Sequence, residues 1–147
     1  MFGKKKSPAS PLVLSAEKFD TLIGPQCEMH GRILAKDSLR LDGTVVGHIE
    51  AHSDLPITVV IGASGVVQGD VRAHRIIVAG KVTGNIHALE RIELHTSALV
   101  QGDIKYGSLA VEHGARVLGL LLQIDSQIPD HSEDEVRAVI QSEGLKN

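Results

Sequence analysis

A six-fold repeat constrains this chain more than any other feature of its sequence. Six glycines, called anchor glycines below, each have an apolar residue two positions before and two positions after them. The spacing from one to the next is 16, 22, 15, 18 and 17 residues. Self-similarity at such a period is typical of proteins whose repeats bury their apolar faces only by stacking. The anchor glycines are Gly31, Gly47, Gly69, Gly84, Gly102 and Gly119.

Apolar residues align in columns around the anchor glycines and alternate with the period of a β-strand. The column before the glycines is Met29, Val45, Val67, Val82, Val100 and Val117. The column after them is Ile33, Ile49, Val71, Ile86, Ile104 and Leu121. A further apolar pair recurs as Leu39/Leu41, Val59/Ile61, Ile76/Val78, Ile92/Leu94 and Leu109/Val111. Turn-forming residues break the alternation every few positions, so we predict very short strands.

A repeat of about 17 residues with two or three short strands is typical of one rung of a β-solenoid. Rungs stack at about 4.8 Å, so six of them predict a rod about 29 Å long. The "HSDLP" stretch at 52–56 accounts for the longest repeat as a surface loop. We expect the polar residues after the anchor glycines to form a solvated face. These residues are Arg32, His48, Asp70, Asn85 and Asp103.

The handedness of the coil is less directly encoded. A left-handed β-helix uses a strict six-residue apolar period, and the run Ile76, Val82, Ala88, Leu94, Val100 has that spacing. Elsewhere the repeat length drifts, and the column containing Ile33 falls outside the six-residue period. The sequence therefore favours an all-β, single-stranded right-handed parallel β-helix of about six rungs.

Composition narrows the class of protein further. The chain has 147 residues, a formal charge of −3 and only three aromatic residues, so its core must be aliphatic. The single Cys27 fits a reducing cytoplasm. "MFGKKKSPAS" lacks the apolar segment of a signal peptide, and no apolar run is long enough to span a bilayer. The mildly acidic charge predicts no nucleic-acid partner.

Residues 21 to about 122 resemble the bactofilins, a bacterial family of polymer-forming cytoskeletal proteins. The resemblance is carried by "DTLIGPQCEMHGRI", "LRLDGTVVGHIEA" and "IIVAGKVTGNIHA", and by the N-terminal "MFGKKK". The last rung, "VLGLLLQ", departs from the pattern at the position after its glycine. The resemblance implies a right-handed β-helix that polymerises without nucleotide, through its two ends, into non-polar filaments. It also implies attachment to the inner face of the cytoplasmic membrane by the N-terminal tail.

The two open ends of a solenoid present unpaired strand edges and apolar cross-sections, which must be capped or used. We predict that residues 21–124 form the polymerisation domain and that its ends are the contacts. "LGLLLQI" at 118–124 is the most apolar run of the chain. The predicted interface residues are Leu22, Ile23, Leu118, Leu120, Leu121, Leu122 and Ile124.

Two tails flank the predicted coil. Residues 1–20 are expected to be a flexible tail whose Phe2, Lys4, Lys5 and Lys6 bind the inner membrane, although a charged, solvated terminus is the simpler interpretation. Residues 125–147 form an acidic tail that recruits a partner or keeps the polymer soluble. A short helix there, with Ser132 and Glu135 as a capping box, would instead cap the last rung.

Eight histidines raise the alternative of a β-helical enzyme acting as a discrete trimer, either an acyltransferase or a protein like gamma-class carbonic anhydrase. His52, in the longest loop, is the single candidate for a catalytic base. His48 and His52 flank a predicted corner rather than sharing a face, and we expect the histidines to be ordinary surface residues. No phosphate-binding glycine loop is present. We therefore predict a non-enzymatic scaffold for cell-wall synthesis, hydrolase or other envelope proteins, with no nucleotide, metal or other cofactor.

Overall fold

A computed structural model describes residues 19–52 and 54–124 as a rod built only of β-strands and turns. Residues 1–18 of the predicted N-terminal tail (1–20), and the whole predicted C-terminal tail at 125–147 with its expected helix, lie outside the described residues. The strands are β1 (Thr21–Ile23), β2 (Glu28–His30), β3 (Ile33–Ala35), β4 (Leu39–Leu41), β5 (Thr44–Val46), β6 (Ile49–Ala51), β7 (Thr58–Ile61), β8 (Val66–Gln68), β9 (Val71–Val78), β10 (Lys81–Thr83), β11 (Ile86–Leu94), β12 (Leu99–Gln101), β13 (Ile104–Val111), β14 (Arg116–Leu118) and β15 (Leu121–Gln123).

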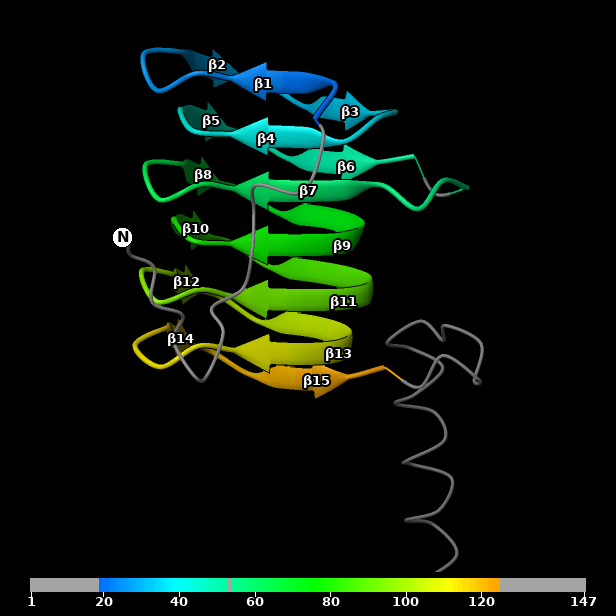
Figure 1. The fold of residues 1–147 in the computed structure, drawn as a ribbon, viewed down its shortest axis with the longest axis vertical. Coiled ribbons are helices and arrows are strands. Elements are labelled where there is room, and N and C mark those ends of the chain that lie inside the picture. The colour runs from blue at the N-terminus through cyan, green and yellow to red at the C-terminus, as the bar shows by residue number, and fades with distance from the viewer. Residues whose placement is uncertain (1–18, 53, 125–147) are drawn as a thin grey trace, which may run out of the picture.

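The strands form three parallel faces around a common core (Figure 1). The first face contains β1, β4 and β7, followed by the second halves of β9, β11 and β13. The second face is the six-stranded sheet from β2 to β14. The third face contains β3, β6, the first halves of β9, β11 and β13, and then β15. Each turn of the coil visits the three faces once, which gives six rungs. The chain winds down the rod in a right-handed sense, as predicted (Figure 1).

Strand pairing confirms the predicted columns. Met29 pairs with Val45, Val45 with Val67, and the same register continues to Val117. On the third face the register runs from Ile33 through Ile49 and Val71 to Leu121. Each residue therefore stacks on its counterpart in the next rung, and like side chains form columns along the inside of the rod. We call these columns the inner columns.

The core is aliphatic, as the composition predicted. Among the described residues, all of its buried members are Val, Ile, Leu or Ala, and Tyr106, which is half-buried, is the one aromatic residue packed against it. Val45, Val67, Val82 and Val100 are fully buried in one column. Burial of each such side chain contributes about 1.5–3 kcal/mol. Stacking thus supplies the apolar burial that a single rung of this length lacks.

The anchor glycines are required by two separate constraints. All six have φ between 125° and 158°, a region that residues with a Cβ rarely adopt. From Gly47 onward there is also no space for a side chain. A Cβ on Gly84 would lie 2.2 Å from the carbonyl oxygen of Gly69, and Gly102 is equally crowded by Gly84. The repeat of glycine therefore allows successive corners to stack in close contact.

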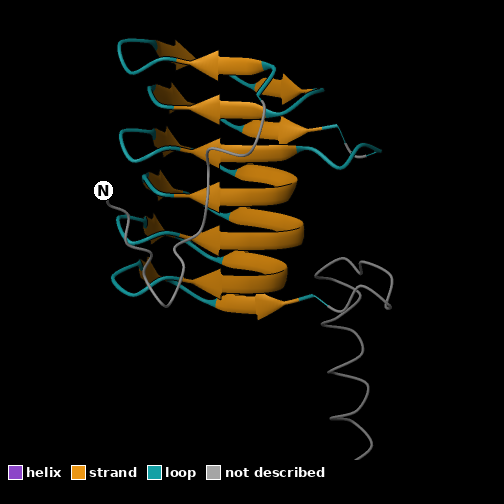
Figure 2. Ribbon diagram, viewed as in Figure 1, coloured by secondary structure: helices purple, strands orange, loops and turns teal. Residues whose placement is uncertain are grey.

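Differences at two corners account for the uneven repeat length. Residues 52–57 connect β6 to β7 as a loop at the corner between the third and first faces, where the sequence predicted one (Figure 2). The strands β9, β11 and β13 instead run continuously around this corner. The register shifts between Ala88 and Arg91 in β11, which takes one residue more than β9 to turn the corner. The corner between the first and second faces also varies, since two residues connect Leu41 to Thr44 and Val78 to Lys81, whereas four residues connect the corresponding strands in the other rungs. Extra residues are thus accommodated at two corners while the core columns stay in register.

Candidate assembly surfaces at the two ends of the rod

The terminal rungs leave open hydrogen-bonding edges. At the N-terminal end, β1, β2 and β3 pair only with the rung below them, through β4, β5 and β6. At the other end, β14 pairs only with β12, β15 only with the first half of β13, and the second half of β13 only with β11. An unpaired edge of this kind is a template for pairing with another chain. Each end therefore presents three short parallel edges around an apolar cross-section.

At the C-terminal end the inner columns terminate in exposed aliphatic side chains. Val111 is 52% exposed and Leu121 is 44% exposed, although their partners in the preceding rung, Leu94 and Ile104, are fully buried. Val117 is half-buried at the end of the second-face column. These residues lack only the rung that would cover them. The end is therefore a cross-section of the core open to solvent.

The N-terminal end is less exposed. Met29 is 39% exposed at the start of the second-face column, and Ile33 is half-buried at the start of the third-face column. Ile23, which the sequence analysis placed in the interface, is buried and belongs to the core cluster. In the part of the chain that the structure describes, only part of the core cross-section at the N-terminal end is thus exposed to solvent.

The predicted interface leucines divide into two groups. Leu121 lies at the end of an inner column. Leu22, Leu118, Leu120 and Leu122 occupy the alternate positions that face outward, and all four are exposed, while Ile124 follows β15 and is half-buried. The sequence analysis missed Met29, Val111 and Val117, although the alternation that placed Val100 and Leu94 inside also places them at the ends of inner columns. The role of all these residues in assembly stays a prediction.

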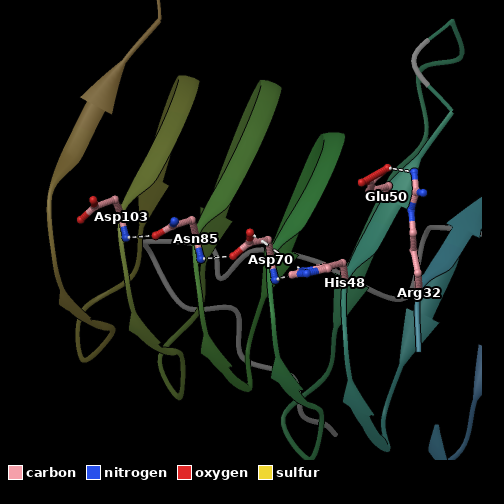
Figure 3. Close-up of polar contacts among 6 residues, drawn as sticks. All are labelled: Arg32, His48, Glu50, Asp70, Asn85 and Asp103. Atoms are coloured by element: carbon pink, nitrogen blue, oxygen red, sulfur yellow. Dashed lines mark hydrogen bonds and ion pairs between the residues drawn. The ribbon is translucent and has the colours of Figure 1, made fainter. Parts of the chain in front are cut away.

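A ladder of side-chain to backbone hydrogen bonds runs along the corner that follows the anchor glycines (Figure 3). We call it the acceptor ladder. The backbone N–H of Asp70 donates to Nδ1 of His48 at 2.9 Å, and that of Asn85 donates to Oδ1 of Asp70 at 2.9 Å. The N–H of Asp103 donates to Oδ1 of Asn85, and that of Leu120 to Oδ1 of Asp103, both at 3.0 Å. The four acceptor residues are exposed, as predicted, but each also ties its rung to the next.

The acceptor ladder has a direction and two ends. It begins at His48, because the guanidinium of Arg32 has no acceptor and instead donates to Oε1 of Glu50 at 2.5 Å (Figure 3). It stops at Leu120, whose side chain cannot accept a hydrogen bond. The departure of the last rung from the repeat therefore has a structural meaning: position 120 cannot continue this ladder into a further rung.

A family model described as "Bactofilin: Polymer-forming cytoskeletal" matches residues 21–121, which cover the whole coil up to the first residue of β15. The chain belongs to the bactofilin family. It is 36% identical to bactofilin BacO of Myxococcus xanthus over 100 residues, which is 68% of this chain and 76% of BacO. It is 33% identical to BacP of the same organism over 111 residues, 76% of this chain and 45% of BacP.

A solved bactofilin structure shares the fold. It is a cryo-EM reconstruction of Thermus thermophilus bactofilin in double helical filaments, 27% identical to this chain, with a TM-score of 0.58. The match covers 71% of this chain and 97% of that one. This bactofilin is therefore a cytoskeletal protein of a polymer-forming family rather than an enzyme, and the alternative of a β-helical acyltransferase or carbonic anhydrase is set aside.

Four of the described histidines have local, structural surroundings in this bactofilin. His48 serves the acceptor ladder, His30 contacts Glu28 at 2.7 Å, and Nδ1 of His52 accepts the N–H of Asp54 at 3.3 Å. The expectation of surface histidines is wrong for His95, which is buried with its ring nitrogens 3.8 Å from Glu93 and from Glu112. Within residues 19–52 and 54–124, no three His, Cys, Asp or Glu side chains gather closely enough to hold a metal ion. The same part of the chain has no helix with the length and apolar character needed to cross a membrane.

Proposed function

We propose that this chain is a scaffold that assembles end to end, without nucleotide, into filaments at the inner face of the cytoplasmic membrane. The observation that carries the proposal is the open cross-section at the C-terminal end, where Val111, Val117 and Leu121 end three inner columns. Covering apolar area contributes about 25 cal/mol per Å². A second copy placed on this end would cover the side chains and pair the strand edges at once. The Thermus thermophilus relative was solved as double helical filaments, which supports assembly into filaments.

The acceptor ladder favours a joint between like ends. In a head-to-tail joint, position 120 of one rod would lie over Arg32 of the next and would have to accept its backbone N–H. Leu120 cannot do so, whereas every earlier position from His48 onward does. A two-fold joint, in which the same surface of both copies meets, needs no continuation of this parallel ladder. The filament is accordingly non-polar.

The N-terminal tail is the proposed membrane contact. Three lysines near anionic lipid contribute about 1 kcal/mol each, and a buried phenylalanine contributes about 1.5–3 kcal/mol. Lys4, Lys5, Lys6 and Phe2 together give about 5 kcal/mol, which corresponds to binding of a single chain in the millimolar range. A filament presents many tails at once, and avidity then holds it on the surface. Envelope proteins, such as enzymes of cell-wall synthesis or hydrolysis, are the proposed cargo.

Electron microscopy of purified protein, with no nucleotide or metal added, tests the proposal. We expect uniform filaments from the wild type. Leu121→Arg places a charge at the end of an inner column and should leave folded monomers or single-joint dimers, whereas Leu55→Arg, at an exposed leucine of the 52–57 loop, should not affect assembly. Folding is checked by circular dichroism. Compact trimers of the wild type, or normal filaments of folded Leu121→Arg, would refute the end-to-end assignment.

A further inference from the structure

The outward positions on the first face form a column that differs from those of the other two faces. Strand pairing aligns Leu22, Arg40, Val60, Ile77, Glu93 and Ala110 in this column. These residues alternate along their strands with core residues such as Val59 and Ile76, so their side chains point outward from the wall of the coil. Val60 and Ile77, the two central members of the column, are aliphatic.

Val60 and Ile77 are nevertheless buried. Val60 is 0% exposed and Ile77 is 3% exposed, yet neither belongs to the core cluster. Among the described residues, the outward columns of the other faces behave differently. Val46, Gln68 and Thr83 on the second face are exposed or half-buried, and Leu34 on the third face is 52% exposed. We call Val60 and Ile77, with the buried Thr58 and Ala79 beside them, the flank strip.

The described residues supply no second layer over the flank strip. Every strand in residues 19–52 and 54–124 belongs to the single wall of the coil, and the remaining described residues form its corners and one corner loop (Figure 2). An outward aliphatic pair on such a wall would keep part of its surface in water. Its burial therefore points to a covering segment outside these ranges.

We propose that the N-terminal segment Leu12–Leu14 of the same chain docks on the flank strip. The described chain enters the coil on this face, where the backbone N–H groups of Asp20 and Thr21 both donate to the carbonyl oxygen of Ser38 at 3.1 Å. Val60 and Ile77 lie two and three rungs further, about 10 and 14 Å away. Five extended residues span about 17 Å, so the chain from Phe19 back to Leu14 reaches the strip.

Charge and sequence favour this segment over the acidic C-terminal one. "LVL" at 12–14 is a continuous aliphatic run that matches the aliphatic strip. The side of the strip nearer the C-terminal end is bordered by Glu93, whose carboxylate already pairs with Arg91 at 2.9 Å, and, beyond it, by Glu112, both largely shielded from solvent. Residues 125–135 carry Asp125, Asp130, Glu133, Asp134 and Glu135. Carboxylates brought next to carboxylates in a partly buried site are disfavoured.

Docking at this position sets where the N-terminal tail leaves the rod. The tail is held on the side of the rod, while the two ends remain open for stacking. A basic tail anchored on the flank of each subunit would then face a surface that runs parallel to the filament. Contact between subunits and contact with a surface thus use separate parts of the molecule.

Disulfide trapping in the full-length protein tests the docking. In a Cys27→Ser background, Leu12→Cys, Val13→Cys or Leu14→Cys is combined with Ile77→Cys and oxidised with copper–phenanthroline. The matched control pairs each of the three with Leu34→Cys, an outward residue of the third face. A third pair, Ile128→Cys with Ile77→Cys, examines the C-terminal segment. Mixing ¹⁵N-labelled and unlabelled chains before oxidation lets mass spectrometry separate bonds within a chain from bonds between chains.

Docking predicts a disulfide within one chain between Ile77→Cys and at least one of the three N-terminal positions, with none to Leu34→Cys. Any of four results would overturn the docking. These are failure of all three N-terminal cysteines to react with Ile77→Cys, equal reaction with Leu34→Cys, bonds only between chains, and preferential reaction of Ile128→Cys with Ile77→Cys. Hydrogen exchange gives a second readout that needs no cysteine. The amides of 12–14 should be protected in the wild type and in Leu34→Asp and should lose protection in Ile77→Asp, and fast exchange in the wild type would equally refute the docking.

Discussion

At the scale of single residues, two adjacent positions hold each corner of the rod together. The anchor glycine allows one corner to approach the next, as the contact between Gly84 and the carbonyl of Gly69 demonstrates. The residue after it provides an acceptor for the next backbone N–H, as Asn85 does for Asp103. The first position is restricted by space and φ, and the second only by its need for an acceptor. This explains why glycine is invariant along the repeat while the next residue changes.

Two glycine variants separate backbone strain from crowding. Gly31→Ala places a Cβ at φ 125° where nothing lies within 4 Å, so it should cost about 1–3 kcal/mol of unfolding free energy through strain alone. Gly84→Ala adds a Cβ 2.2 Å from the Gly69 oxygen and should cost more than about 4 kcal/mol. Urea unfolding in the Leu121→Arg background measures both. Equal costs would show that crowding along the glycine column is relieved by small shifts.

The acceptor ladder is tested at Asn85. Asn85→Ala removes the acceptor for the N–H of Asp103 and should lower the unfolding free energy by about 0.5–1.5 kcal/mol. Asn85→Asp keeps an oxygen at the same place and should stay within about 0.5 kcal/mol of the starting protein. Urea unfolding again provides the comparison. A loss as large for Asp as for Ala would show that the acceptor itself contributes little.

At the scale of elements, the rung is the repeating unit of the coil, and its three corners differ in how many connecting residues they accept. The corner between the third and first faces is turned by continuous strand in β9, β11 and β13 but by the loop 52–57 between β6 and β7. The corner at Gly80 is tight, since Gly80 is buried and a Cβ there would lie 2.3 Å from the oxygens of Gly62 and Gly65. The length of this corner nevertheless varies, because two residues connect Val78 to Lys81 but four connect Leu94 to Leu99. Only the corner of the anchor glycines has the same length, two residues, in all six rungs.

Insertions should follow this difference. Four Gly/Ser residues placed after Asp54 lengthen an exposed loop, and lengthening a loop adds less than about 1 kcal/mol of closure entropy. The same insertion between Gly84 and Asn85 interrupts the corner whose length is constant, together with the close stack of anchor glycines and the bond from the Asn85 N–H to Oδ1 of Asp70. Thermal melting should barely change for the first protein and fall steeply for the second. Similar melting temperatures would contradict the rigid-corner interpretation.

At the scale of the whole molecule, the proposed function couples a weak tail to a polymer. Wild-type filaments should sediment with anionic vesicles, whereas Leu121→Arg monomers with the same tail should bind at least about tenfold more weakly, because they lack avidity. Replacing Lys4, Lys5 and Lys6 by Gln should release the filaments without changing their appearance. Equal binding of monomers and filaments would show that the tail suffices alone, and binding unaffected by the Lys→Gln changes would place the lipid contact elsewhere.

The amino-acid sequence determined the coil, its six rungs and the membership of the inner columns except for Ile23, because each rung repeats a period-two pattern around a glycine whose positive φ disfavours other residues. Val45, Ile49 and Leu41 were assigned to the core from that pattern alone, and strand pairing confirms them. The tertiary structure decided what surrounds the outward positions, since alternation states only that a side chain faces out. It distinguished Leu121, at the end of an inner column, from the outward Leu120 and Leu122. It also showed that the polar residues after the anchor glycines, which the sequence predicted only as a solvated face, form the acceptor ladder. It also buried Val60 and Ile77, because what covers an outward residue depends on chain segments distant in sequence.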